Sequence, residues 1–270
     1  MKPRAPIARH PRLKASWRSD PLKPRAPGPG HPVAVAIMAK WPRAGQVKTR
    51  LSPPLDAAGA AALYRGFLLD KIEQVRALEG AEPALAYTPA GARADFAALA
   101  RGFTLVAQQG PDLGTRLHHV LGTLLAAGHT GAIAIDSDTP TLPVGFLQQA
   151  VDLLGDPGTE VVLGPTEDGG YYLIGLKTPR SELFQAMPWS TPGVLDETLR
   201  RTAALGLRAV CLPSWFDVDT PEDLERLRIS LATLGAAAPR HTAACLVEGR
   251  PPRAPIARHP RFKASSRSDK

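Results

Sequence analysis

The stretch Val33–Arg50, VAVAIMAKWPRAGQVKTR, joins a continuous apolar run to a strongly basic loop. The apolar run Val33–Ala39 predicts a strand that is buried on both faces of a sheet. The loop behind it holds four cations and a glycine: Lys40, Arg43, Gly45, Lys48 and Arg50. Ligands of α/β sheets bind beyond the carboxyl ends of the strands, so the loop is placed to bind a phosphate chain.

The alternative for this loop is an exposed basic segment without a ligand. A Walker loop does not fit, because Pro42 and Val47 stand where that motif requires glycines. The four cations are a local excess, since the 206 residues between the two chain ends hold only 17 Lys and Arg. We therefore favour a phosphate-binding role.

Apolar runs and helical patterns alternate along the rest of the chain. This alternation predicts an α/β fold, with a mostly parallel mixed sheet covered by helices on both faces. We expect one folded domain over residues 33–235. The expected strands are 33–39, 84–87, 104–107, 132–136, 160–163, 171–176 and 208–212, and the expected helices are 56–78, 92–100, 113–127, 144–154, 193–205 and 221–234.

Composition excludes several classes of protein. The 270 residues are 44% hydrophobic, which is enough for a large core, but no apolar run approaches the roughly 20 residues of a membrane span. The basic N-terminus lacks the apolar stretch of a secretory signal. Two cysteines, Cys211 and Cys245, provide neither a disulfide framework nor zinc spacing. We expect a soluble cytoplasmic protein.

The net charge of +8 comes from the two ends of the chain. Residues 1–32 carry eight Lys and Arg against one acid, and residues 239–270 carry eight against two. The middle has 17 basic and 22 acidic residues, a net charge of −5. Pro3–Asp20 and Pro252–Asp269 match at 16 of 18 positions.

The repeated ends are rich in proline and poor in apolar residues, so residues 1–32 and 236–270 are predicted to be disordered tails. We expect them to be flexible flanks without a catalytic role. The alternative is an arm that contacts acidic partners or nucleic acid weakly, by charge alone. Deletion of both tails separates the two readings.

A pair of carboxylates, Asp136 and Asp138, directly follows the predicted strand at 132–136. Residues at i and i+2 of an extended segment point the same way, so both can face one cation. Mg²⁺ or Mn²⁺ takes one or two carboxylates and completes its shell with water and phosphate oxygens. Simple turn chemistry is the alternative, but a turn or cap requires one carboxylate and not two.

Two further acidic motifs follow later strands. Asp168-Gly169-Gly170 precedes Tyr171, and the Asp168 carboxylate could bind a sugar hydroxyl, act as a base or be a further metal-linked group. A hairpin turn is the structural alternative. Asp217 and Asp219 repeat the i, i+2 spacing before a helix that Thr220 would cap. One of these two aspartates, with Asp219 preferred, would complete a metal shell.

Six ordered strings resemble one known family over about residues 33–234. They are AKWPRAGQVKTRL from Ala39, QGPDLGTRL from Gln109, IDSDTPTL from Ile135, LGPTEDGGYYLIGL from Leu163, PWSTPGVLDET from Pro188 and FDVDTPEDL from Phe216. Together they resemble the DUF2064 group of GT-A-fold, glycosyltransferase-like enzymes, one branch of which is associated with arsenosugar biosynthesis. The first string also resembles a segment of 2-phospho-lactate guanylyltransferase, related to other nucleotidyltransferases.

The resemblance implies roles for individual residues. Asp136 and Asp138 would be the metal pair, with Asp138 and Asp168 catalytic. Tyr171 and Tyr172 stand where the guanylyltransferases have Asn, which puts 2-phospho-lactate in doubt as substrate. The nucleotide and its phosphates would lie near Lys40, Arg43, Gly45, Lys48, Arg50, Gln109, Asp112 and Arg116, and the substrate near Gly169, Gly170, Tyr171, Ser190 and Thr191.

Three functions are compatible with these motifs. In glycosyl transfer, which we favour, a metal holds the diphosphate of a nucleotide-sugar while a small acceptor attacks the sugar. In nucleotidyl transfer, a phosphorylated small molecule attacks an NTP and pyrophosphate departs. Both reactions need the same basic loop and metal pair, because both stabilise a leaving phosphate. The third function is a non-catalytic nucleotide sensor.

Overall fold

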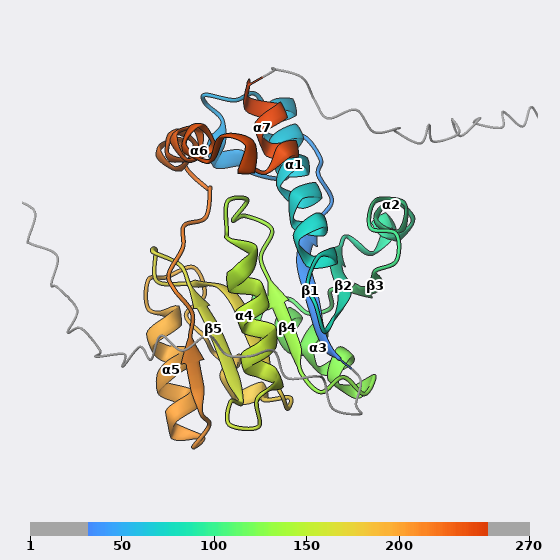
Figure 1. Cartoon of the computed structure of the whole chain (residues 1–270), viewed down its shortest axis with the longest axis vertical. Coiled ribbons are helices and arrows are strands. Elements are labelled where there is room, and N and C mark those ends of the chain that lie inside the picture. The colour runs from blue at the N-terminus through green and yellow to red at the C-terminus, as the bar shows by residue number, and fades with distance from the viewer. Residues whose placement is uncertain (1–31, 248–270) are drawn as a thin grey trace, which may run out of the picture.

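The computed structural model describes residues 32–247, which form a single α/β domain (Figure 1). The tails expected at residues 1–31 and 248–270 lie outside the described residues. A seven-stranded sheet has the order β3-β2-β1-β4-β6-β5-β7. Its strands are β1 (Val33–Lys40), β2 (Ala81–Thr88), β3 (Thr104–Ala107), β4 (Ala132–Ile135), β5 (Val161–Pro165), β6 (Tyr171–Leu176) and β7 (Ala209–Cys211).

All neighbouring strands are parallel except those that pair with β6, which runs antiparallel to both β4 and β5. The expected mostly parallel mixed sheet is therefore confirmed. The helices that accompany it are α1 (Ala57–Arg76), α2 (Arg93–Leu99), α3 (Leu113–Ala126), α4 (Val144–Gly155), α5 (Val194–Ala204), α6 (Pro221–Leu234) and α7 (Arg240–Val247).

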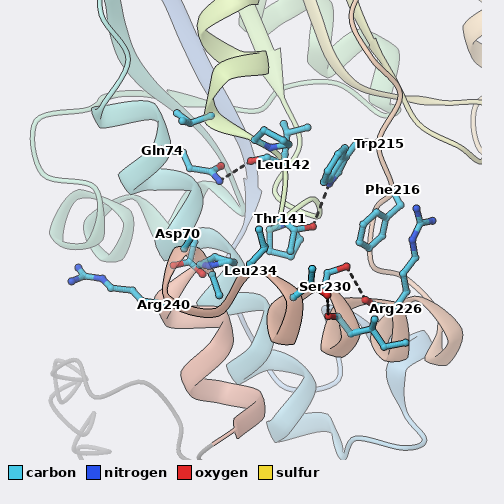
Figure 2. A pocket seen from close by; sticks show the side chains of 18 of the residues that line it. Asp70, Gln74, Thr141, Leu142, Trp215, Phe216, Arg226, Ser230, Leu234 and Arg240 are labelled. Carbon is cyan, nitrogen blue, oxygen red and sulfur yellow. Dashed lines mark hydrogen bonds between the residues drawn. The ribbon is translucent and has the colours of Figure 1, made fainter.

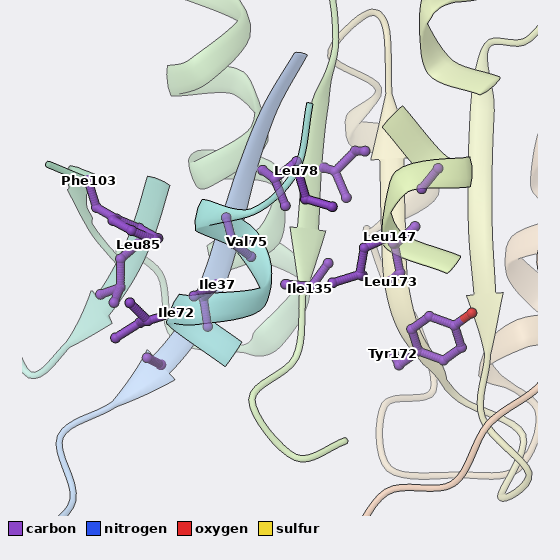
Figure 3. Packing of buried hydrophobic residues seen from close by; sticks show 14 of the residues in the cluster. Ile37, Ile72, Val75, Leu78, Leu85, Phe103, Ile135, Leu147, Tyr172 and Leu173 are labelled. Atoms are coloured by element: carbon purple, nitrogen blue, oxygen red, sulfur yellow. The ribbon is translucent and has the colours of Figure 1, made fainter. Parts of the chain in front are cut away.

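The side chains of β1 divide the core into two layers. Val33, Val35 and Ile37 point to one face, where they pack with residues of α1, α2 and α4, as Figure 3 shows for Ile72 and Leu147. The opposite face presents alanines from β1, β2 and β4, and α3 packs on it through its buried leucines. Small side chains on this face let α3 approach the sheet closely, while branched residues fill the other layer.

A third cluster lies beyond the carboxyl ends of the parallel strands. It joins Leu51, the first half of α1, Phe216, Val218 and the buried leucines of α6. In Figure 1, α6 and α7 lie beside the upper part of α1, away from the sheet. This cluster fixes the loop after β1 and the segment 216–220 relative to each other, and both carry predicted site residues.

The folded domain extends beyond the boundary predicted at residue 235. Helix α7 lies in the segment expected to be disordered, and it packs along α1. Asp70 of α1 explains this order, because its carboxylate accepts hydrogen bonds from the backbone N–H groups of His241 and Thr242 and from the Thr242 hydroxyl. Gly66 lets the helices meet, since a Cβ there would lie 3.0 Å from the His241 carbonyl. The boundary prediction was wrong at this end.

Within residues 32–247, no helix combines the length and the apolar character that a membrane crossing requires.

Candidate active site

The motifs singled out from the sequence lie where the sheet topology predicts. β1 and β4 are adjacent and parallel, so the loop after Lys40 and the loop after Ile135 leave the same edge of the sheet. β6 is antiparallel and begins at that edge, which brings Gly169 and Gly170 there as well. The segment 217–219 reaches the edge through a hydrogen bond from the Val218 N–H to the Asp138 carbonyl oxygen, 3.0 Å long.

The basic loop after β1 folds back on itself. The Lys40 ammonium donates a 2.8 Å hydrogen bond to the Gln46 carbonyl oxygen, and Gly45 adopts a φ of 73°. Lys48 also has a positive φ, 48°, which is uncommon for a residue with a side chain. Such a conformation persists where surrounding contacts enforce it, often at a functional site. Here it precedes the short helical turn Thr49–Leu51.

Lys48 is held by two carboxylates from distant parts of the chain. Its Nζ lies 2.6 Å from Asp138 Oδ1 and 2.7 Å from Asp219 Oδ1, and only 4% of its side chain is exposed. Burial alone lowers the pKa of an ammonium, but the charges of Asp138 and Asp219 outweigh it and raise the pKa of Lys48 above its usual value. Two of the predicted metal ligands therefore converge on one cation, which in this structure is Lys48.

Asp136 lies on the other side of this loop and faces a different lysine. The Thr139 hydroxyl donates to Asp136 Oδ1 at 2.7 Å, and the fully buried Lys71 donates to the Thr139 carbonyl and hydroxyl oxygens at 2.9 and 3.0 Å. Burial raises the pKa of Asp136 to about 7, with Lys71 opposing and Asp138 adding to the shift. Burial likewise lowers the pKa of Lys71.

Tyr64 of α1 is a site residue that the sequence reasoning missed. Its hydroxyl accepts the Lys40 backbone N–H at 3.1 Å and lies 2.9 Å from Ser137 Oγ, which also donates to the Met38 carbonyl oxygen. Burial and the charge of Asp138 raise the pKa of Tyr64 to about 12, so the hydroxyl keeps its proton. Tyr64 thus ties the basic loop to the carboxylate loop.

A pocket of about 470 Å³ lies between these loops, a size that suits a small ligand. Seven of the predicted site residues line it: Lys40, Lys48, Arg50, Arg116, Asp136, Asp138 and Asp219. Tyr64 and Gln108 are further lining residues. Arg43, Gly45, Gln109 and Asp112 are exposed nearby in the chain and do not line it.

The predicted nucleotide string at Gln109–Arg116 has a local structural role as well. Asp112 caps α3, because its carboxylate accepts the Thr115 N–H at 2.8 Å. A capping signal of this kind was readable from Asp and Thr three residues apart. Arg116 Nε donates to the Gly110 carbonyl oxygen at 2.9 Å, which directs its guanidinium along the loop that enters α3.

The glycines after Asp168 are explained by packing between segments. Gly169 has a φ of 94°, and a Cβ there would lie 2.1 Å from the Pro192 carbonyl oxygen. Its own carbonyl oxygen accepts the Leu195 N–H at 2.9 Å. This contact holds the turn against the segment that carries Ser190 and Thr191, both of which are exposed. The predicted substrate residues from these two strings therefore form one continuous region.

The two tyrosines after this turn differ in position. Tyr172 is a core residue, 1% exposed, and its hydroxyl donates to the Pro213 carbonyl oxygen. Tyr171 packs edge-on against Trp189, with ring centroids 6.3 Å apart. Neither tyrosine lines the 470 Å³ pocket.

Asp168 is exposed, and its Oδ1 accepts hydrogen bonds from the Thr166 hydroxyl at 2.5 Å and the Gly170 N–H at 3.1 Å. Burial raises the pKa of Asp217 to about 6, and the charges of Asp168 and Asp219 add to the shift.

The carboxylates can be tested as a metal site by their geometry. Within residues 32–247, the ligand atoms of Asp136, Asp138 and Asp219 do not all come within 4.8 Å of one another. Asp138 and Asp219 do converge, since both contact Lys48 Nζ, and oxygen donors of this kind suit Mg²⁺ or Mn²⁺. A two-carboxylate site thus fits better than the predicted site of three.

In the part of the chain that the structure describes, three other residues do bring their ligand atoms within 4.8 Å of one another: Asp70, Glu73 and His241. These residues already have partners: Asp70 binds the start of α7, and Glu73 pairs with Arg240 and His241. We assign this group to the docking of α7.

A second cavity, of about 860 Å³, opens between α6 and the segment that enters α4 (Figure 2). Trp215 Nε1 donates to Thr141 Oγ1 in its wall, and Gln74 donates to the Leu142 carbonyl oxygen. Its lining is mainly apolar and includes none of the site residues predicted from the sequence. Nothing in it identifies an occupant.

Comparison with known proteins identifies relatives of this chain. A family model, DUF2064, described as "Uncharacterized protein conserved in bacteria", matches residues 71–191. A structure from Desulfovibrio desulfuricans G20, provisionally described as a nucleotide-diphospho-sugar transferase, shares 31% identity with a TM-score of 0.73. That match covers 80% of this chain and 94% of the other. No curated protein sequence matches the chain significantly.

Two more distant structures resemble the fold. CMP:2-keto-3-deoxy-manno-octonic acid synthetase complexed with CTP is 16% identical, with a TM-score of 0.48 over 75% of this chain and 99% of that one. Glucosyl-3-phosphoglycerate synthase from Mycobacterium tuberculosis, in complex with Mn²⁺, UDP and glucosyl-3-phosphoglycerate, is also 16% identical. Its TM-score is 0.45, over 81% and 80% of the two chains. At this distance neither bears on the function of this chain.

Proposed function

Because this chain belongs to the DUF2064 family of GT-A-like transferases, we propose that it is a metal-dependent glycosyltransferase acting on a nucleotide-sugar and a small-molecule acceptor. One observation carries the proposal. The basic loop after β1 and the carboxylates Asp138 and Asp219 line the same 470 Å³ pocket at the carboxyl edge of the sheet. A leaving diphosphate carries developing negative charge. Basic side chains and a carboxylate pair that binds a metal, all facing one pocket, would stabilise that charge.

The donor would bind across the basic loop. Lys40 and Arg50 line the pocket and would supply charge-assisted hydrogen bonds to phosphate oxygens. Lys48 lines the same pocket and contacts the carboxylate of Asp138. Arg43 and Gly45, both exposed, extend this surface. We assign the nucleoside to the neighbouring string with Gln109, Asp112 and Arg116, of which Arg116 lines the pocket.

Asp138 and Asp219 are the groups we assign to a bound Mg²⁺ or Mn²⁺, with Asp136 behind them. When bound, the ion would neutralise charge that develops on the departing phosphate. Asp136 keeps the loop in place through Thr139, and Tyr64 fixes it to the basic loop. The hydrogen bonds of Asp136 and Tyr64 hold the carboxylate loop and the basic loop in place before a ligand binds, which is part of the preorganisation that electrostatic catalysis needs.

The acceptor would bind along the edge formed by Asp168, Gly169, Gly170, Tyr171, Ser190 and Thr191. Asp168 is the exposed carboxylate of this region, and Thr166 and Gly170 hold one of its oxygens in place. We assign it to the acceptor hydroxyl, as hydrogen-bond acceptor and proton acceptor.

Nucleotidyl transfer is the second candidate, and the positions of two tyrosines leave the pocket compatible with it. The Tyr171-Tyr172 pair departs from the guanylyltransferase pattern, yet neither residue lines the pocket. The departure therefore leaves the phosphate-binding groups unchanged, and they would stabilise a leaving pyrophosphate equally well. In this reaction a phosphorylated small molecule would attack the α-phosphate of an NTP.

One pair of assays separates the two reactions. The full chain with Mn²⁺ is screened by thermal shift against nucleotide-sugars and NTPs, since a bound ligand raises the apparent stability. The ligand that binds is then incubated with candidate acceptors, and released nucleoside diphosphate and pyrophosphate are measured separately. We expect nucleoside diphosphate, whereas pyrophosphate release from an NTP would establish the second candidate instead.

Asp138→Asn should lower turnover by at least about 100-fold, the scale expected when a main electrostatic group of the transition state is lost. The matched control is Asp152→Asn on the exposed side of α4, where the Asp152 carboxylate accepts a hydrogen bond from the Gln148 side chain at 3.0 Å. Equal turnover in the two variants would contradict the assignment of Asp138.

A further inference from the structure

Lys48 occupies the place where two carboxylates could hold a divalent ion. Its ammonium contacts Asp138 and Asp219 at 2.6 and 2.7 Å, and both distances are those of charge-assisted contacts. The side chain is 4% exposed and lies on the ring of Phe67, 5.9 Å from its centroid. One of the two negative charges is thus already balanced by a group of the protein itself.

The remaining carboxylate of the loop is balanced separately. The Thr139 hydroxyl donates a hydrogen bond to Asp136. The Lys71 ammonium in turn donates to the carbonyl and hydroxyl oxygens of Thr139. Lys71 is fully buried among the core residues of α1, so it has no open space to enter. Lys48, by contrast, lines the 470 Å³ pocket together with Lys40 and Arg50. Only Lys48 is placed to exchange one anionic partner for another.

We propose that Lys48 competes with the divalent ion for Asp138 and Asp219, and that the displaced ammonium turns into the pocket to bind the diphosphate of the donor. The inference rests on the proposed function, because it assumes a phosphorylated donor in this pocket. Two cations that share the same two carboxylates repel each other, so the ion and the Lys48 ammonium compete. Metal and donor therefore bind cooperatively: the metal alone binds weakly, and the donor's phosphates stabilise the displaced Lys48.

The length and position of Lys48 suit this exchange. Its four-carbon stem is flexible and carries a compact point charge, and it extends from a loop whose neighbouring residues Thr49 and Arg50 are exposed. Arginine at this position would exchange less readily, because its planar fork would hold both carboxylates at once.

The first test measures Mn²⁺ binding to the full chain by electron paramagnetic resonance, without nucleotide. In Lys48→Met the internal competitor is gone, and we expect the Mn²⁺ Kd to fall about tenfold or more. Lys40→Met is the matched control: it removes the same charge from the same pocket, but Lys40 Nζ binds the Gln46 carbonyl oxygen and neither carboxylate. Its Kd should change less than about threefold.

An unchanged or higher Mn²⁺ Kd in Lys48→Met overturns the proposal. An equal gain of Mn²⁺ affinity in Lys40→Met also overturns it, because such a gain would reflect net charge alone. These outcomes involve no turnover. They are therefore distinguishable from a failure of the proposed function, which is decided by the released products.

The second test uses the unaltered protein and so does not depend on folding of a variant. The chain is treated briefly with acetic anhydride, with and without Mg²⁺, and acetylation of each lysine is quantified by mass spectrometry. Mg²⁺ should increase labelling of Lys48 at least about threefold as its ammonium leaves the carboxylates. Lys71, which stays buried, serves as the internal control. Labelling of Lys48 that Mg²⁺ leaves unchanged or lowers overturns the proposal.

Discussion

Two buried lysines approach the loop Asp136–Thr139, and they are held in different ways. Lys48 reaches it from the loop after β1 and contacts two carboxylates, Asp138 and Asp219. Lys71 reaches it from α1 and donates to the backbone and side chain of Thr139, and within residues 32–247 no carboxylate lies at hydrogen-bond distance from its ammonium. The pKa of Lys48 is raised, and that of Lys71 is lowered.

The difference separates a functional cation from a structural one. A lysine held by carboxylate charge at the wall of a pocket can exchange partners with a metal or a phosphate. A lysine held by dipoles in the core supports the backbone that carries those carboxylates. Three substitutions test this separation, and we give them in order of their expected effect on stability.

Lys71→Met should destabilise the protein most, by about 3–5 kcal/mol, because it removes the cation that faces buried Asp136 and leaves the Thr139 carbonyl oxygen without its donor. Urea denaturation without metal measures the loss. Lys177→Met removes a half-buried lysine whose ammonium donates only to the exposed Asp156 carbonyl oxygen among the described residues, and it should change stability by about 1 kcal/mol or less. A loss of under 1 kcal/mol in Lys71→Met, on the order of ordinary surface changes, would refute its structural role.

Thr139→Val should have an intermediate effect, about 1–3 kcal/mol, because the lost hydroxyl both donates to Asp136 and accepts from Lys71. The same denaturation experiment measures it. Thr123→Val on α3 is the control, since the Thr123 hydroxyl bonds only to its own helix at His119. If both variants lose the same stability, Thr139 does not couple Lys71 to the loop.

Asp219→Asn should have the smallest effect on stability, about 1 kcal/mol or less, because 42% of the Asp219 side chain is exposed and Asp138 still pairs with Lys48. Mn²⁺ affinity should nevertheless fall about tenfold with the loss of one ligand charge. Asp196→Asn, on the exposed side of α5, controls for charge. A large loss of stability with unchanged Mn²⁺ affinity would make Asp219 a structural residue.

Most of the fold could be predicted because its pattern is local. Each strand is a short apolar run, as in Val33–Ala39, and each helix has an apolar stripe with the helical period. Motifs at the ends of strands could be placed at one edge because β1 and β4 are parallel neighbours. The site residues of the basic loop and the carboxylate loop follow from these two facts.

The features that could not be predicted depend on contacts between residues that are far apart in the sequence. The contact of Lys48 with Asp219 spans 171 positions, and no local rule connects them. Helix α7 was missed for the same reason, since its N-terminus is bound by Asp70 of α1, again 171 residues away.

The position of Lys71 in the sequence contains local information that the predictions did not use. Lys71 stands four residues after Phe67 and four before Val75, within the apolar stripe of α1, where a charge needs an explanation. Tyr64 lies two turns earlier on the same helix, and its hydroxyl within the apolar stripe is a signal of the same kind.

Helix α1 has a consequence for how this protein is prepared and shortened. Tyr64 and Lys71 of this helix contact the site loops. Gly66 and Asp70, from the same part of the helix, contact α7. A chain cut at residue 235 would lose every one of the Asp70 hydrogen bonds to α7 and uncover the notch at Gly66, on the very helix that supports the pocket. Minimal versions of this enzyme should therefore end after Val247, so that the supporting helix keeps its outer partner.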